Sequence, residues 1–278
     1  MNRSICSGLA VVAGCLIAQT ALAQEAVLPH QTFTIESAAV HETRRVNVYT
    51  PPGYDAAPGT RFDVLYMPDG GVDEDFPHVV ATADSAIRAG EMRPVIVVGI
   101  VNTERRRDMT GPTSVARDSA IAPRVGGSAA FRRFIATELI PEVGRRYRVS
   151  EHRAIIGESL AGLFIVETFF EQPELFDTYI ALDPSLWWNG EALVRSAGDR
   201  LGERRDLRAA FFFSSSDEEG IALPSGRLAR TLRDLAPLGV HWEYTPLTNL
   251  THGTIYRAEA PRMLRVALPP QPAHPRAR

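Results

Sequence analysis

The chain of 278 residues has 33 acidic residues against 30 arginines and no lysine, which gives a formal net charge of −3. So small a charge argues against a nucleic-acid partner, and the absence of lysine excludes a lysine nucleophile or base. Both cysteines, Cys6 and Cys15, lie among the first 23 residues, so the remaining chain can form neither a disulfide nor a cysteine-ligated metal site.

Residues 1–23 have the layout of a secretory signal. Arg3 precedes an apolar run over residues 5–17, and Ala21-Leu22-Ala23 supplies an Ala-x-Ala cleavage site. The run is too short and too interrupted to span a membrane. An alternative is a lipoprotein signal in which Cys15 is lipidated. We therefore expect a periplasmic or secreted protein with no integral membrane segment after cleavage.

Removal of the signal would leave 255 residues (278 − 23), which suits one α/β domain over residues 24–268. The expected strands cover residues 32–35, 45–49, 62–67, 94–101, 153–156, 179–182, 209–213 and 240–244. The expected helices cover residues 75–89, 128–147, 160–171, 191–201, 225–235 and 255–266. Their alternation predicts an α/β fold with one mainly parallel, doubly wound sheet and helices on both faces.

Three local features qualify this layout. The first two strands predict a hairpin at the edge of the sheet, and Pro141 predicts a kink in the helix over residues 128–147. The tail at residues 269–278 is rich in proline and arginine and is not expected to pack.

Residues 102–127 form a long polar segment with little periodicity. Loops of this length are usually functional or disordered, and this one follows a strand, so it should overhang the edge where active sites form. Its arginines are Arg105, Arg106, Arg107, Arg117 and Arg124. They either meet an acidic group of a substrate or, the more common case, form a solvated face.

The sequence Ile-Ile-Gly-Glu-Ser-Leu-Ala-Gly at residues 155–162 is the centre of the chain. An apolar strand, a sharp turn at Ser159 and a helical pattern are the context of a nucleophile elbow. Gly157 removes a side chain that would collide at the turn, and Gly162 lets the helix lie close to the sheet. The turn exposes the serine hydroxyl and directs a helix N-terminus at the charge that develops during acyl transfer. A helix cap is the alternative role for Ser159.

A serine nucleophile needs a base, and the base needs an acid to fix its tautomer. In α/β hydrolases the chain order is serine, acid, histidine. Ser159, an acid within residues 217–219, and His252 satisfy this order, and each follows an expected strand. Asp183 is a rival for the acid, although its Asp-Pro setting suits a turn.

Further motifs follow in order along the chain. They are RVNVYTPPGY (45–54), VLYMPDGG (64–71), VIVVGI (95–100), PSLWW (184–188) and THG (251–253). Together with the elbow, they resemble the Putative esterase family of α/β hydrolases, and the resemblance covers residues 32–266. That family includes enterochelin (siderophore) esterases, feruloyl and acetylxylan esterases, S-formylglutathione hydrolase and mycolyltransferases.

The resemblance implies roles for particular residues. It makes Ser159 the nucleophile and His252 the base, with the backbone N–H groups of Gly71 and Leu160 as the oxyanion hole. A Gly-x-x-Glu pattern of siderophore esterases aligns with residues 216–219 and implies Glu219 as the acid. Serine stands at residue 216 instead of glycine, so Asp217 and Glu218 stay open, as does a dyad without a strong acid.

The expected function is hydrolysis of a carboxylic ester through an acyl-enzyme on Ser159, without a metal or organic cofactor. The substrate would be a small-molecule ester such as a siderophore lactone, a sugar-linked acyl ester or a short-chain ester. Trp187 and Trp188 either line its pocket or anchor a loop. Two alternatives are acyl transfer to a sugar or lipid alcohol, and a binding module without catalysis on a hydrolase scaffold.

Overall fold

The computed structural model describes residues 27–270. The signal at residues 1–23, the lipidation alternative at Cys15 and residues 271–278 of the tail lie outside the described residues. No helix within residues 27–270 is both long enough and apolar enough to cross a membrane.

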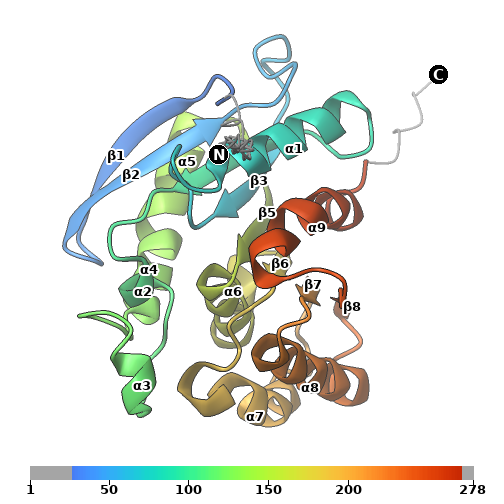
Figure 1. Cartoon of the computed structure of the whole chain (residues 1–278). Helices are drawn as coiled ribbons and strands as arrows, with labels where there is room; N and C mark the ends of the chain where they lie inside the picture. Colours follow the sequence, from blue (N-terminus) through green and yellow to red (C-terminus); the bar gives the residue numbers. More distant parts are fainter. Residues whose placement is uncertain (1–26, 271–278) are drawn as a thin grey trace, which may run out of the picture.

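Within this range, eight strands form a single sheet. They are β1 (Gln31–Ser37), β2 (Glu42–Tyr49), β3 (Phe62–Met67), β4 (Val95–Ile100), β5 (Val149–Glu158), β6 (Thr178–Leu182), β7 (Ala209–Ser215) and β8 (Val240–Pro246). Their order is β1-β2-β4-β3-β5-β6-β7-β8. Figure 1 shows β1 and β2 at one end of the sheet and β7 and β8 at the other. The pairs β1–β2 and β2–β4 are antiparallel, and all the other neighbours are parallel. The mainly parallel, doubly wound sheet is therefore confirmed. The hairpin is present, but of its two strands only β1 lies at the edge of the sheet, because β2 also pairs with β4.

The helices are α1 (Phe76–Arg88), α2 (Arg105–Asp108), α3 (Ala116–Ser119), α4 (Ser128–Phe134), α5 (Ile140–Arg146), α6 (Leu160–Glu171), α7 (Trp188–Glu203), α8 (Glu219–Leu235) and α9 (His252–Ala267). A π-helical segment (Ile135–Leu139) joins α4 to α5, and a 3₁₀ turn (Pro173–Leu175) follows α6. Helices α1 and α9 cover one face of the sheet, where Phe76 and Met263 share a core with Val97 of β4. Helices α4, α6 and α8 contribute to the core on the other face, among them Phe164 and Leu228.

The predicted helix over residues 128–147 is one continuous rod with a π-helical segment at its middle. Pro141 has no N–H and cannot donate to the carbonyl four residues before it. The rod widens just ahead of the proline, where the Ile140 N–H donates to the Ile135 carbonyl five residues back. The irregularity that Pro141 predicts is therefore present as a π-helical segment.

Several elements begin earlier than the sequence indicates. Helix α8 begins at Glu219 and α9 at His252, six and three residues before the predicted starts. The segment over residues 102–127 is not devoid of structure, since it contains α2 and α3. These differences decide where the polar groups of the site lie.

Candidate functional site

Ser159 stands on a strained turn between β5 and α6. Its backbone has φ 61° and ψ −119°, a positive-φ conformation that residues other than glycine rarely adopt. The neighbouring glycines make room for it. A Cβ on Gly157 would lie 2.7 Å from Cβ of Ala161, and one on Gly162 would lie 3.1 Å from the carbonyl oxygen of Leu182 in β6. The strand, turn and helix of a nucleophile elbow are therefore present.

Hydrogen bonds fasten this turn to the end of β6. The Ser159 N–H donates to the Leu182 carbonyl at 3.1 Å, and the Ser185 N–H donates to the Ser159 carbonyl at 3.0 Å. The Ser159 Oγ lies 3.4 Å from the Ser185 Oγ. Within the described residues, no direct hydrogen bond joins the Ser159 hydroxyl to His252; such bonds are often long in a site without substrate.

His252 is the first residue of α9 and pairs with an acid. Thr251 caps the helix through a capping box with Thr254. The Nδ1 of His252 lies 2.6 Å from Oδ2 of Asp183, whose side chain is fully buried. This hydrogen bond is the main cause that raises the pKa of His252 above its usual value, while burial opposes the rise.

Asp183 is held rigidly for this contact. It follows β6 directly and has a φ of 47°, in the left-handed region that aspartate tolerates better than most residues. Its other oxygen, Oδ1, accepts the Ser216 N–H at 2.5 Å. The carboxylate thus has one oxygen fixed by the backbone and the other directed at the histidine.

The acid in the structure is therefore not the one that the sequence favours. Glu219 is exposed at the first residue of α8, and Asp217 and Glu218 are exposed beside it. Within the described residues none of the three hydrogen-bonds to His252. The physical reason is that the chain enters α8 directly after β7, and the end of β7 supplies a backbone donor to Asp183 instead of an acid. A usable signal was the position of Asp183 immediately after the strand that neighbours β5.

A second carboxylate lies at the same histidine nitrogen. Oε1 of Glu158, the residue before the nucleophile, is 3.4 Å from Nδ1 of His252. Burial is the main cause that raises the pKa of Glu158 to about 7, and the charges of His252 and Arg105 oppose the rise.

Glu158, Asp183 and His252 bring one ligand atom each within 4.8 Å of one another, the only such group in residues 27–270. We do not interpret the group as a metal centre. In the neutral imidazole, an Nδ1 that donates its proton to Asp183 has no lone pair left for a cation.

The two predicted oxyanion donors differ in availability. Leu160 is the first residue of α6, so its N–H has no partner within the helix and points out of the helix N-terminus. The Gly71 N–H, in contrast, donates to Oε2 of Glu74 at 2.6 Å, and the Asn102 N–H reaches the same oxygen at 3.4 Å. Burial raises the pKa of Glu74. In this conformation only Leu160 offers a free donor of the predicted pair.

Of the two tryptophans, Trp188 anchors a loop. Its ring is buried, and its Nε1–H donates to the Gly111 carbonyl at 2.9 Å. It also borders a cavity of about 320 Å³ between α6 and α7. Trp187 is half-buried and packs against the same core. A role of Trp187 and Trp188 in substrate binding stays a prediction.

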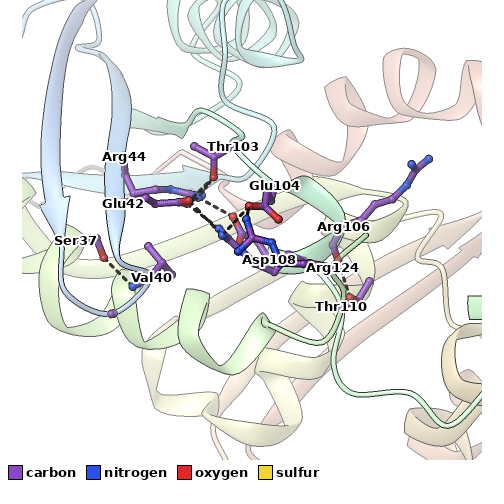
Figure 2. Close-up of polar contacts among 12 residues, drawn as sticks. Ser37, Val40, Glu42, Arg44, Thr103, Glu104, Arg106, Asp108, Thr110 and Arg124 are labelled. Atoms are coloured by element: carbon purple, nitrogen blue, oxygen red, sulfur yellow. Dashed lines mark hydrogen bonds and ion pairs between the residues drawn. The ribbon is translucent and has the colours of Figure 1, made fainter. Parts of the chain in front are cut away.

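The arginine-rich segment is built around ion pairs with β2 (Figure 2). Arg44 is fully buried, and its Nη1 donates to Glu42 at 2.5 Å and to Asp108 at 2.7 Å. Arg107 bonds the same Glu42 at 2.7 Å, and Arg124 pairs with Glu104. Most of the segment's positive charge is thereby neutralised within the protein.

Arg106 is the exception. Its exposed side chain extends away from the ion-pair network in Figure 2, and its Nη1 donates only to the Ile121 carbonyl, at 3.0 Å. It borders an open cavity of about 600 Å³. The lining residues are Glu104, Arg105, Arg106, Arg107, Ala122, Pro123 and Arg124. Arg105 connects this cavity to the site, because its guanidinium pairs with Asp69 beside the Gly70-Gly71 turn.

The chain is similar to known proteins in sequence and in fold. The model of the family described as Putative esterase matches residues 37–259. The ferri-bacillibactin esterase BesA of Bacillus subtilis is 26% identical over 84% of this chain and 88% of its own length. A siderophore enterobactin esterase of Emericella nidulans is 31% identical, over 58% of this chain and 56% of its own length.

Solved structures show the same fold. An IroE-like serine hydrolase from Shewanella oneidensis superposes with a TM-score of 0.77 at 24% identity, over 86% of this chain and 79% of that one. The siderophore hydrolase EstB from Aspergillus nidulans superposes with a TM-score of 0.72 at 21% identity, over 91% of this chain and 98% of that one.

Proposed function

Because the chain belongs to the Putative esterase family, and is thus a carboxylic ester hydrolase with the α/β-hydrolase fold, we propose that it acts through an acyl-enzyme on Ser159. The observation that carries the proposal is the strained elbow, beside which His252 of α9 pairs with Asp183, a buried aspartate that follows the neighbouring strand β6. We assign the acid to Asp183 in place of Glu219.

We assign a residue to each step of the reaction. His252 removes the proton of the Ser159 hydroxyl through Nε2, and the hydroxyl oxygen attacks the ester carbonyl. Asp183 holds the Nδ1 proton and stabilises the imidazolium. The Leu160 N–H, at the N-terminus of α6, faces the negative charge on the carbonyl oxygen. His252 then protonates the leaving alcohol, and water releases the acyl group by the same route.

Gly71 can contribute to the oxyanion hole only if the Glu74 carboxylate leaves its N–H. A substrate oxyanion at this donor would take the place that Glu74 Oε2 now has. The raised pKa of Glu74 makes its protonated, weaker-accepting form more accessible. We therefore treat Leu160 as the first donor and Gly71 as a donor that substrate must uncover.

For the substrate, we propose an ester with an acidic group on its acyl or alcohol part. The relative from Emericella nidulans is named as a siderophore enterobactin esterase, and the one from Bacillus subtilis as a ferri-bacillibactin esterase. The cavity along α2 supports the same choice, since Arg106 faces it without a carboxylate partner among the described residues. A carboxylate or phenolate of a siderophore-type lactone, or of a sugar-linked acyl ester, would complete this charge. We further propose export to the periplasm or medium, on the strength of residues 1–23 alone.

The direct test is labelling of the purified protein with a fluorophosphonate probe, together with hydrolysis of 4-nitrophenyl acetate. We expect labelling and turnover in the wild type, neither in Ser159→Ala, and strongly reduced rates of both in His252→Ala. A folded wild-type protein that neither labels nor hydrolyses any ester of a broad panel would refute the proposal.

A further inference from the structure

We propose that Glu158 is a second carboxylate partner of His252, a positioning residue that acts with Asp183 on the imidazolium formed during acyl transfer. The inference rests on the proposed function of Ser159 and His252. It adds a residue that the sequence motif treats as variable, since any residue can stand between the glycine and the serine of the elbow.

The geometry directs both carboxylates at one nitrogen. Oδ2 of Asp183 is 2.6 Å from His252 Nδ1, and Oε1 of Glu158 is 3.4 Å from the same atom. The shorter distance makes Asp183 the hydrogen-bond acceptor of the Nδ1 proton. Glu158 acts on the imidazole ring through its charge at close range. Only 16% of the Glu158 side chain is exposed, so water screens this interaction weakly.

Charged groups from three other elements surround Glu158. Arg105 of α2 opposes its burial cost, whereas Asp75, at the N-cap of α1, and Asp183, after β6, add negative charge. Tyr256 lies one turn along α9 from His252. Burial is the main cause that raises the pKa of Tyr256, and the charge of Glu158 adds to the rise. Arg105 is itself held by two bonds to Asp69, at 2.6 and 2.8 Å. Burial, helped by Asp183 and Asp75, raises the pKa of Glu158, and the charges of His252 and Arg105 offset only part of that rise.

The charge of Glu158 affects how readily His252 accepts the proton of Ser159. When Ser159 gives its proton to His252, a positive charge forms next to both carboxylates. An ionised Glu158 stabilises that charge, and a protonated one does not. Burial raises the pKa of Glu158 to about 7, and because its Oε1 lies 3.4 Å from Nδ1 of His252, the protonation of the one group affects that of the other. The acid limb of the pH profile then belongs to the pair and spans two coupled titrations.

The test is the pH dependence of kcat/KM for 4-nitrophenyl acetate in wild type and Glu158→Gln, with the product read at its isosbestic wavelength. Glutamine keeps the shape and removes the charge. We expect the acid limb to move down by about one pH unit and to sharpen to a single titration, because a negative neighbour of His252 is lost. The plateau of kcat should fall about 3–10-fold, because the imidazolium loses the same stabilisation.

Glu218→Gln is the matched control. Glu218 also acts on His252 through its charge, but it is exposed to water and makes no contact with the ring. Its removal should move the acid limb by less than about 0.3 unit, because solvent screens the charge. A shift in Glu158→Gln no larger than in this control would overturn the inference.

Two further measurements distinguish a failure of the role of Glu158 from a failure of the proposed function or of folding. Titration of the downfield Nδ1 proton signal of His252 in both folded proteins reports the same pKa change without turnover. If Glu158→Gln does not fold, Glu158→Asp, which withdraws the carboxylate by one methylene, is titrated instead, with the same direction of shift expected. A wild type without esterase activity contradicts the proposed function, whereas an active wild type with unchanged titration in the variant contradicts only the role of Glu158.

Discussion

Replacement of Asp183 by asparagine is the sharpest test of the site, because the structure favours Asp183 as the acid and the Gly-x-x-Glu pattern favours Glu219. Asparagine retains the size of the side chain and an oxygen for the Ser216 N–H, but it loses the charge. Breaking a buried, hydrogen-bonded charge pair costs ~3–5 kcal/mol, which corresponds to a rate loss of about 10²–10⁴-fold. One third of the His252 side chain is exposed, and water screens that part, so we expect the lower half of this range, about 10²–10³-fold in kcat.

The assay compares kcat and fluorophosphonate labelling rates of Asp183→Asn with those of Glu219→Gln. Glu219 is exposed at the start of α8, and its replacement should change kcat less than about twofold, as for other surface changes. Circular dichroism and urea unfolding establish that both variants are folded. A large loss in Glu219→Gln, with near-normal turnover in Asp183→Asn, would refute the assignment and restore the acid that the sequence favours.

Three further expectations follow from the geometry. The raised pKa of His252 means that the base is protonated and inactive until pH exceeds that pKa, so the acid limb of kcat/KM should lie above 6.5, and a limb at or below 6.5 contradicts this. Gly70→Ala should lower the free energy of unfolding, measured in urea, by ~2–3 kcal/mol, because the added Cβ would lie 2.2 Å from the backbone of β4. Gly59→Ala is the control and should be nearly neutral, because the added Cβ would have no atom within 4 Å. Arg106→Gln should raise KM about 3–5-fold for an ester that bears a carboxylate and leave a neutral ester unaffected, while Arg117→Gln, outside the cavity lining, changes neither.

The sequence is sufficient for the sheet and the sharp turn at Ser159 because their signals are local. Continuous apolar runs mark the parallel strands, and the glycines around Ser159 mark a turn that few other structures need. His252 could also be found from the sequence, since it follows the last strand in a short polar segment. What the sequence did not give was its exact setting: the residue begins a helix instead of lying in a loop.

The acid was missed because its place depends on spatial order. The Gly-x-x-Glu pattern places the acid after β7, whereas Asp183 follows β6, which pairs directly with β5. Glu158 and Glu74 were missed for a related reason. Each contacts a site residue through a side chain whose direction depends on the folded backbone, at His252 in one case and at the Gly71 N–H in the other.

The arginine-rich segment shows a third kind of limit. From residues 102–127 alone, a solvated face was the more common interpretation. Instead, most of its arginines form ion pairs with acidic side chains. One of these acids, Glu42, lies in β2, about sixty residues earlier in the chain. Of the segment's five arginines, only Arg106 has no acidic partner among the described residues, a distinction that needs coordinates.

The hydrogen bonds between the elbow and β6 have a consequence for heat inactivation. Ser159 and Asp183 stand on two adjoining strand ends joined by backbone bonds, so they can separate only if the centre of the sheet opens. His252, in contrast, comes from the first turn of a terminal helix, and helix ends open at much lower free energy than central strands. On heating, the enzyme should therefore become reversibly inactive by withdrawal of its base, at a temperature below that at which the sheet melts.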